Sequence, residues 1–230
     1  MCIRDSLFHF AKPAEILPWD FGPREALDYP VRVVEHFSQG QAGRSHDIGC
    51  AVGRSSYEMS RNSDKVIGID FSHAFAKAAE TIKEGPQTIP RLEEAHQNSQ
   101  LQVQLPEEVS ADRCSFEQGD AMNLREDLGT FDRVLAANLI CRLPNPEKFL
   151  ARLPSLVNSG GEVVLATPCT WLAEFTPPDN WPAGSTLDWL KNTLEKDFEL
   201  ITEANEPFLI RETARKFQWT VALVTKWRKK

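Results

Sequence analysis

One feature of the sequence restricts the fold most: a short strand runs into a loop of small residues and then into a helix. Residues 45–48 are predicted to form the strand, Gly49–Gly53 the loop and residues 55–61 the helix. Gly49 and Gly53 allow the positive φ angles and close backbone approaches of such a turn. An open α/β sheet binds its ligand at a turn of this kind, so we expect such a sheet, with a ligand site after its first strand.

Strands and helices alternate along most of the remaining sequence. The predicted elements that follow are strands at residues 65–69, 114–118, 131–137 and 162–167 and helices at 74–82, 147–156 and 186–195. This alternation predicts a parallel sheet with helices on both faces. Residues 198–204 and 216–227 are strands with no helix between them, so they should pair antiparallel. We expect a Rossmann-like α/β fold with a seven-stranded, mostly parallel sheet and one antiparallel strand near its edge.

Two regions lie outside this alternation. Residues 1–40 are aromatic- and proline-rich and then helical, and we expect them to cover the active site of a domain that spans residues 41–230. Residues 84–112 are polar and contain three prolines, which predicts a surface insertion. Residues 1–6 resemble a translated sequencing artefact, so we do not take them as the native N-terminus.

Composition excludes several classes of protein. The formal net charge is −7, which argues against nucleic acid as the main partner because phosphate binding needs a basic surface. No apolar run reaches the length of about 18 residues that a membrane span requires, and no secretory signal is evident. The 5 cysteines show no metal-ligand spacing, so we expect reduced thiols, a cytoplasmic location and no metal site.

Polar side chains follow four of the predicted strands. A dinucleotide loop would require glycine where Ala51 and Arg54 stand, and Asp47 would repel a pyrophosphate, which disfavours a nicotinamide oxidoreductase. Asp47 suits a cation instead, such as the ammonium and sulfonium of S-adenosylmethionine (SAM). Asp70 can accept the hydroxyls of a ribose. A tight turn without a ligand, or a helix cap at Asp70, remains the structural alternative.

The next two strands end in further polar groups. Asp120 can accept from an adenine amino group, and the backbone N–H of Ala121 can reach the ring. Asn138 would lie beside both the donor and the acceptor, although Asp120 and Asn138 could also be ordinary turn residues. The predicted cofactor-binding residues are Asp47, Gly49, Cys50, Ala51, Gly53, Asp70, Phe71, Ser72, Asp120, Ala121 and Asn138.

These motifs, across about residues 44–167, resemble class I SAM-dependent methyltransferases, whose sheet order places the last strand antiparallel between its neighbours. A narrower resemblance covers nearly all of residues 19–228. The methyltransferase domain of ovothiol-biosynthesis enzymes is similar to the strings DIGCAVGRSS (47–56), GIDFSHAF (68–75), ANLICRL (137–143), TPCTWLAEFTP (167–177) and IRETARKFQ (210–218). This resemblance implies methylation of an imidazole nitrogen of 4-mercaptohistidine (5-thiohistidine), giving ovothiol A. It also implies a sulfoxide synthase of the same pathway as a partner, fused or separate.

A small amino-acid acceptor needs further contacts. Arg142 or Arg211 could hold its carboxylate, and Trp19, Phe21 and Trp171 could wall its ring. Thr167 completes the predicted substrate-binding residues, and Asn138 and Glu174 are the candidate catalytic residues. Exposed arginines and core aromatic residues are common, so each of these also has a purely structural explanation. Methylation of another metabolite, or a cofactor-binding domain that has lost catalysis, stays open as an alternative.

Overall fold

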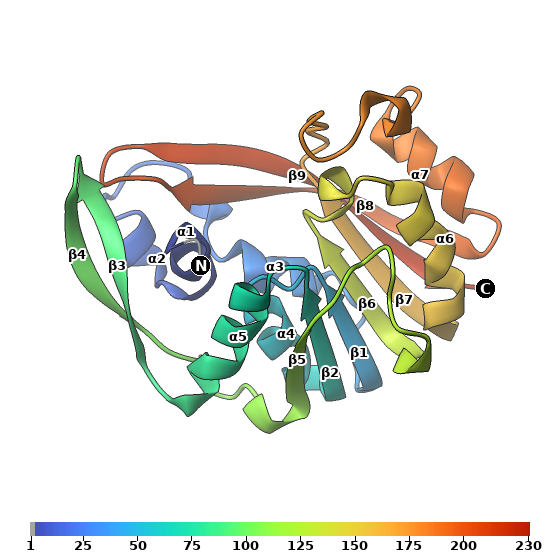
Figure 1. Cartoon of the computed structure of the whole chain (residues 1–230), viewed down its shortest axis with the longest axis horizontal. Coiled ribbons are helices and arrows are strands. Elements are labelled where there is room, and N and C mark those ends of the chain that lie inside the picture. Colours follow the sequence, from blue (N-terminus) through green and yellow to red (C-terminus); the bar gives the residue numbers. More distant parts are fainter. Residues whose placement is uncertain (1–2) are drawn as a thin grey trace.

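A seven-stranded sheet forms the centre of the computed structural model, which describes residues 3–230 (Figure 1). Met1 and Cys2, within the predicted N-terminal segment, lie outside the described residues. The strands in spatial order are β5 (Cys114–Gln118), β2 (Ser63–Asp70), β1 (Ala42–Ile48), β6 (Phe131–Ala137), β7 (Val157–Thr167), β9 (Phe217–Lys229) and β8 (Phe198–Arg211).

The sheet is parallel from β5 to β7, and β9 runs antiparallel between β7 and β8. The predicted Rossmann-like sheet is therefore confirmed, including its reversed strand. The predicted strand at residues 198–204 was too short, because β8 continues to Arg211 in register with β9. Most of this extension pairs with the part of β9 before Leu223, which no longer pairs with β7.

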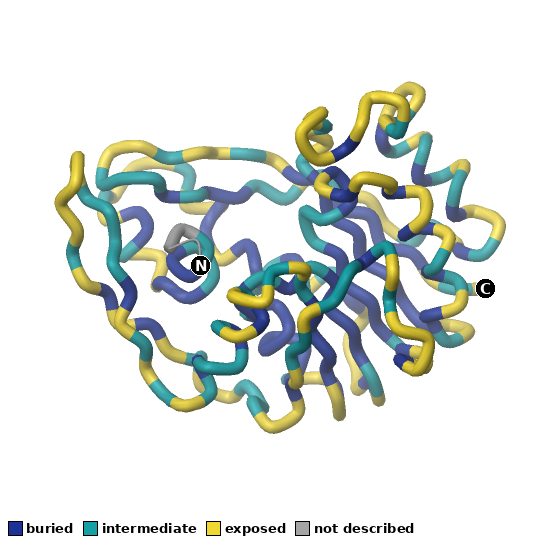
Figure 2. Tube along the Cα trace, viewed as in Figure 1, coloured by how far each residue is buried: buried dark blue, intermediate teal, exposed yellow. Residues whose placement is uncertain are grey.

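Side chains that alternate along the central strands enter two separate cores. Leu135 of β6 packs in one core, whereas its neighbours Val134 and Ala136 pack in the other, as the two-residue period of a strand requires. α3 (Tyr29–Glu35), α4 (Arg54–Met59) and α5 (His73–Thr81) contribute to the first core. α6 (Pro146–Leu156) and α7 (Thr186–Leu194) contribute to the second. Figure 2 shows the central strands as the most continuously buried part of the trace.

A second lobe projects from the sheet (Figure 1). It contains α1 (Ile3–Phe10), α2 (Pro13–Ile16), the far ends of β8 and β9, and an antiparallel hairpin of β3 (Gln87–Glu94) and β4 (Gln97–Val103). The hairpin lies within residues 84–112, the expected polar insertion. One face of it is nevertheless apolar and joins the first core through Ile89, Leu101 and Val103.

Short 3₁₀ helices complete the connections between these elements. They are η1 (Arg24–Ala26), η2 (Ser60–Asn62), η3 (Ile82–Glu84), η4 (Ala111–Arg113), η5 (Glu126–Leu128), η6 (Ile140–Arg142) and η7 (Pro178–Asn180). Across residues 3–230, no helix combines the length and apolar character needed to cross a membrane.

Candidate active site

A cleft opens where β1, β2 and β6 end, between the sheet and the second lobe. Its main chamber has a volume of about 780 Å³ and lies under α1 and the ends of β8 and β9. A side chamber of about 470 Å³ extends toward the end of β5. The two chambers share the lining residues Gly49, Asp70, Phe71, Leu139, Arg142 and Phe175, so we treat them as one cleft.

Asp70 stands at the junction of the two chambers. Its Oδ2 accepts the backbone N–H of Ala51 at 2.9 Å and its Oδ1 that of Ser72 at 2.8 Å. Burial raises the pKa of Asp70, while these two hydrogen bonds oppose the rise. Phe71 beside it is 75% exposed, which is unusual for a phenylalanine and leaves its ring free for a planar ligand. The two predicted donor contacts Asp70 and Phe71 therefore lie together in the cleft.

The glycine loop places only some of its predicted residues in the cleft. Gly49 and Ala51 line it, and Ala51 has a φ of 47°. Cys50 is 3% exposed and does not line either chamber. Gly53 has a φ of 90°, and a Cβ there would lie 2.8 Å from the Phe116 ring. The structure thus does not bring Cys50 and Gly53 to the cleft lining, and Gly53 permits packing between α4, α5 and β5.

Asp47 also differs from its expected role. It is 2% exposed beneath the loop, and its Oδ2 accepts the hydroxyl of Ser56 at 2.6 Å. Burial raises the pKa of Asp47 to about 7, and the negative charge of Asp70 adds to the rise. The structure therefore does not place Asp47 in direct contact with a donor cation. The carboxyl group supports the start of α4 from below.

The side chamber collects the predicted adenine contacts. Asp120 and Ala121 line it, and Asp120 Oδ1 accepts the backbone N–H of Met122 at 2.9 Å. Glu174 lines the same chamber, at the end predicted for adenine. Glu174 is absent from the lining of the main chamber, so its expected catalytic role is not supported by its position.

Asn138 lines the main chamber directly after β6. Its backbone has a φ of 55° and donates to the carbonyl of Ala166 at 2.8 Å. The hydroxyl of Tyr29, on α3, donates to Asn138 Oδ1 at 3.3 Å. Burial raises the pKa of Tyr29, so the hydroxyl keeps its proton. Tyr29 was missed from the sequence because no motif surrounds it; only the packing of α3 brings it to the end of β6.

The two predicted carboxylate-binding arginines have different surroundings. Arg142 lines both chambers, and its guanidinium lies 4.5 Å from the centre of the Phe175 ring. Within residues 3–230, no carboxylate forms an ion pair with it. Arg211 is 4% exposed outside the cleft, where its Nη2 lies 2.5 Å from Glu93 of β3. Arg211 is not among the residues that line the cleft, and its Nε and Nη1 are buried without a hydrogen-bond partner among the described residues, so its predicted substrate contact stays a prediction.

The remaining predicted substrate contacts also lie away from the cleft lining. Trp19 stacks on Phe21 with ring centroids 5.6 Å apart, far along the second lobe near Phe217. Trp171 donates to Thr186 and packs edge-on against Trp189. Thr167 is fully buried. The structure therefore places none of these four residues in the cleft lining, and the predicted contacts stay predictions.

β8 and β9 form one wall of the main chamber. Phe208 and Ile210 of β8 lie there with Gln218 and Thr220 of β9. The period of two over residues 217–227 places Gln218 and Thr220 on one strand face, so this alternation was the signal that could have identified them.

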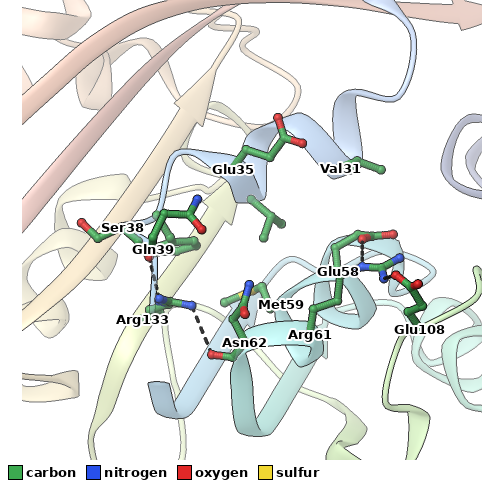
Figure 3. A pocket seen from close by; sticks show the side chains of 12 residues that line it. Val31, Glu35, Ser38, Gln39, Glu58, Met59, Arg61, Asn62, Glu108 and Arg133 are labelled. Carbon is green, nitrogen blue, oxygen red and sulfur yellow. Dashed lines mark hydrogen bonds and ion pairs between the residues drawn. The ribbon is translucent and has the colours of Figure 1, made fainter. Parts of the chain in front are cut away.

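A second cavity, of about 450 Å³, lies at the opposite edge of the sheet, near the amino ends of β1, β2 and β6 (Figure 3). Most of its charged groups have partners. Arg133 donates to the carbonyls of Ser38, Gly40 and Asn62. Glu58 pairs with Arg54 and Arg61. These contacts join elements of the fold and leave little capacity for a ligand. Among the described residues, no group of His, Cys, Asp and Glu is placed to hold a metal.

The cleft fits a nucleoside donor with a charged tail. Asp70 offers carboxylate oxygens at the junction, Phe71 offers a free ring face, and Asp120 offers an acceptor in the side chamber. Gly49, which has no side chain, allows the backbone to approach a ligand closely between these groups. A strand order of this kind, with a reversed strand between its neighbours and a ligand site at the carboxyl ends, defines the class of SAM-dependent methyltransferases with a Rossmann-like fold.

Comparison with known proteins agrees with this class. Residues 46–165 match the family model described as "Methyltransferase domain". The chain belongs to this methyltransferase family and is a SAM-dependent methyltransferase.

Individual relatives are more distant. The phosphatidylethanolamine N-methyltransferase of Cereibacter sphaeroides is 26% identical over 148 residues, which cover 64% of this chain and 61% of that protein. The chain thus spans less than two thirds of the length of this relative. The Bacillus subtilis YcgJ structure has a TM-score of 0.59 at 12% identity, covering 88% of this chain and 98% of the other. The N-methyltransferase NodS from Bradyrhizobium japonicum, in complex with S-adenosylhomocysteine, has a TM-score of 0.59 at 14% identity, covering 96% and 98%.

Proposed function

We propose that the chain methylates an imidazole nitrogen of 4-mercaptohistidine, giving ovothiol A. The observation that carries the proposal is an uncompensated cation in the cleft. Arg142 faces both chambers, without a carboxylate partner among the described residues, at one end of the sequence string that also contains Asn138. All five strings that resemble the ovothiol enzymes contribute to the lining of the main chamber. The residues they contribute include Gly49, Asp70, Arg142, Thr170, Ile210 and Gln218.

The main chamber offers contacts for each part of a thiolated histidine. The planar fork of Arg142 can bind the carboxylate with two parallel hydrogen bonds. The rings of Tyr29 and Phe208, with centroids 5.0 Å apart, form an apolar wall for a five-membered ring. Gln218 and Thr220, the cross-strand partners of Ile210 and Phe208, add hydrogen-bonding groups on the same face of the β8–β9 pair.

Nitrogen and sulfur compete as nucleophiles in this acceptor. Because Tyr29 donates to Oδ1 of Asn138, the amide of Asn138 keeps its Nδ2 hydrogens for a ligand. A hydrogen bond from Nδ2 to the thiolate would lower the reactivity of the sulfur and hold it away from the methyl group. The names of two relatives, the phosphatidylethanolamine N-methyltransferase and NodS, also favour nitrogen as the accepting atom.

Positioning is the main contribution of the protein. When bound, SAM would supply a methyl group on a sulfonium: a nucleophile attacks the methyl carbon in line with the carbon–sulfur bond, and S-adenosylhomocysteine leaves as a neutral thioether. Asp70 and Asp120 would hold the donor, and Arg142 and Asn138 would orient the acceptor. A neutral imidazole attacks through the lone pair of its ring nitrogen and later releases its other ring proton to solvent, so the chain needs no general base. Orientation of this kind can lower a barrier by roughly 7–11 kcal/mol in favourable cases.

The test is a product analysis with SAM carrying a labelled methyl group. 4-Mercaptohistidine, histidine and a simple thiol are offered separately, and mass spectrometry with NMR locates the label. We expect rapid methylation of a ring nitrogen of 4-mercaptohistidine and little label on the other two. Label on sulfur would contradict the nitrogen assignment, and faster turnover of histidine would mean that another metabolite is the acceptor. Asn138→Ala should increase the share of sulfur methylation, while Asn123→Ala, outside the cleft lining, serves as the control.

A further inference from the structure

The loop between β7 and α7, residues 168–185, lies beside the cleft (Figure 1). Phe175 is the residue of this loop that lines both chambers. The loop is fastened at the next residue, because the hydroxyl of the fully buried Thr176 donates to the carbonyl of Leu143 at 2.8 Å. Leu143 directly follows Arg142 in the chain. This hydrogen bond therefore holds the ring of Phe175 next to the arginine that faces the cleft.

The ring of Phe175 is the contact that holds the guanidinium of Arg142. The guanidinium carbon lies 4.5 Å from the centre of the ring. Within the described part of the chain, the guanidinium forms no ion pair and donates no hydrogen bond. An aromatic ring attracts a cation to its face, and such a contact does not consume the N–H groups of the guanidinium. The donors of Arg142 thus stay available to a ligand.

Four acidic residues share the lining of the two chambers with Arg142. They are Asp5, Asp70, Asp120 and Glu174. The carboxylate of Asp70 accepts two backbone N–H groups, and that of Asp120 accepts one. Glu174 is the neighbour of Phe175 in the chain, but neither it nor Asp5 forms an ion pair with Arg142 within residues 3–230. The positive charge of Arg142 therefore remains for an anionic group of the substrate.

We propose that Phe175 is a positioning residue, through which the enzyme selects acceptors that carry a carboxylate. The inference rests on the proposed function, in which Arg142 binds the carboxylate of the acceptor. Contact with the ring restricts the guanidinium and shields one of its faces from water, so that the fork is oriented before the acceptor arrives. Phe175 acts through Arg142, and an acceptor without a carboxylate gains nothing from this arrangement.

The experiment compares the steady-state kinetics of two acceptors, 4-mercaptohistidine and the corresponding amine without the carboxylate. Phe175→Leu keeps an apolar side chain but removes the ring. We expect KM for 4-mercaptohistidine to rise about three- to tenfold, with kcat changed by less than about twofold. KM for the amine should change by less than about twofold. Phe175→Tyr and Phe175→Trp keep a ring face, so both should stay within about twofold of the original KM.

A double-mutant cycle tests whether Phe175 acts through the arginine. In the Arg142→Gln background, Phe175→Leu should raise KM for 4-mercaptohistidine by less than about twofold. Calorimetry should give a Kd for SAM within about twofold of the original in every Phe175 variant. Trp219→Leu is the control, since it removes an exposed aromatic ring outside the cleft lining and should leave both acceptors unaffected. Thermal melts check folding, and Phe175→Met replaces Phe175→Leu if the latter is unstable.

The possible results separate this inference from the proposed function. An equal rise in KM for both acceptors would show that Phe175 only closes the cleft, and a matching loss of SAM affinity would place it at the donor. An effect that persists in the Arg142→Gln background would break the link to the arginine. Each of these results would overturn the inference and leave the proposed function standing. If the unaltered chain methylated neither acceptor, the proposed function would be wrong and the inference would fall with it.

Discussion

Replacement of Asp47 by asparagine should change how the stability of the protein depends on pH. The carboxyl group is 2% exposed, and its pKa is raised from 3.8 to about 7 in the folded chain, mainly by burial. Between these two pH values the folded state holds a proton that the unfolded state releases. The contribution of Asp47 to the free energy of unfolding is therefore most favourable below about pH 4, and it decreases as the pH rises toward 7.

The magnitude follows from the size of the shift. Each pKa unit corresponds to about 1.4 kcal/mol, so a shift from 3.8 to about 7 amounts to roughly 4 kcal/mol as an upper limit. Asparagine cannot ionise, but its carbonyl can still accept the hydroxyl of Ser56. Asp47→Asn should therefore gain stability relative to the original chain as the pH rises from 4 to 8.

The assay is urea denaturation followed by circular dichroism at one-unit pH intervals from 4 to 9. Asp64→Asn is the matched control, because Asp64 is exposed and accepts from Gln41 at 3.0 Å. The difference in unfolding free energy between the original chain and Asp47→Asn should shift by at least about 2 kcal/mol across this range, about half of the upper limit. If the unfolding free energies of the original chain and Asp47→Asn ran parallel across this pH range, the conclusion that Asp47 holds a proton in the folded state would be wrong.

Three further changes test the cleft and the glycine loop beside it. Asp70→Asn should weaken SAM binding by about 1–3 kcal/mol in calorimetry, because the carboxylate oxygens face the donor site; unchanged affinity would contradict the ribose assignment. Gly53→Ala should destabilise the fold by about 2–4 kcal/mol in urea unfolding, from positive φ and contact with Phe116. A loss below about 0.5 kcal/mol there would mean that the turn relaxes freely. Arg142→Gln should raise KM for the acceptor at least tenfold with a nearly unchanged Kd for SAM, whereas an equal effect on both would place Arg142 at the donor instead.

Local patterns in the sequence were sufficient for the sheet and for the donor end of the cleft. The alternation of strands and helices determines a parallel sheet, and the carboxyl ends of its neighbouring strands meet at one edge. Asp70 and Asp120 follow such strands, so both could be placed at that edge without knowledge of packing. Asp47 shows the limit of this reasoning: it lies near the end of β1, as predicted, but its side chain lies beneath the loop and accepts from Ser56.

Only the tertiary structure decided which side chains form the acceptor end. Tyr29, from near the N-terminus, reaches Asn138 across 109 positions of sequence, and His9 reaches the cleft because α1 packs over it. Arg211 and Trp171 have the right chemistry for a substrate, but the fold places Arg211 Nη2 against Glu93 and Trp171 against Thr186, outside the cleft lining. Secondary structure and strand-end positions depend on neighbours in the chain, and a sequence displays those directly. Whether a side chain is free to meet a ligand depends on partners brought together by folding, which no local pattern records.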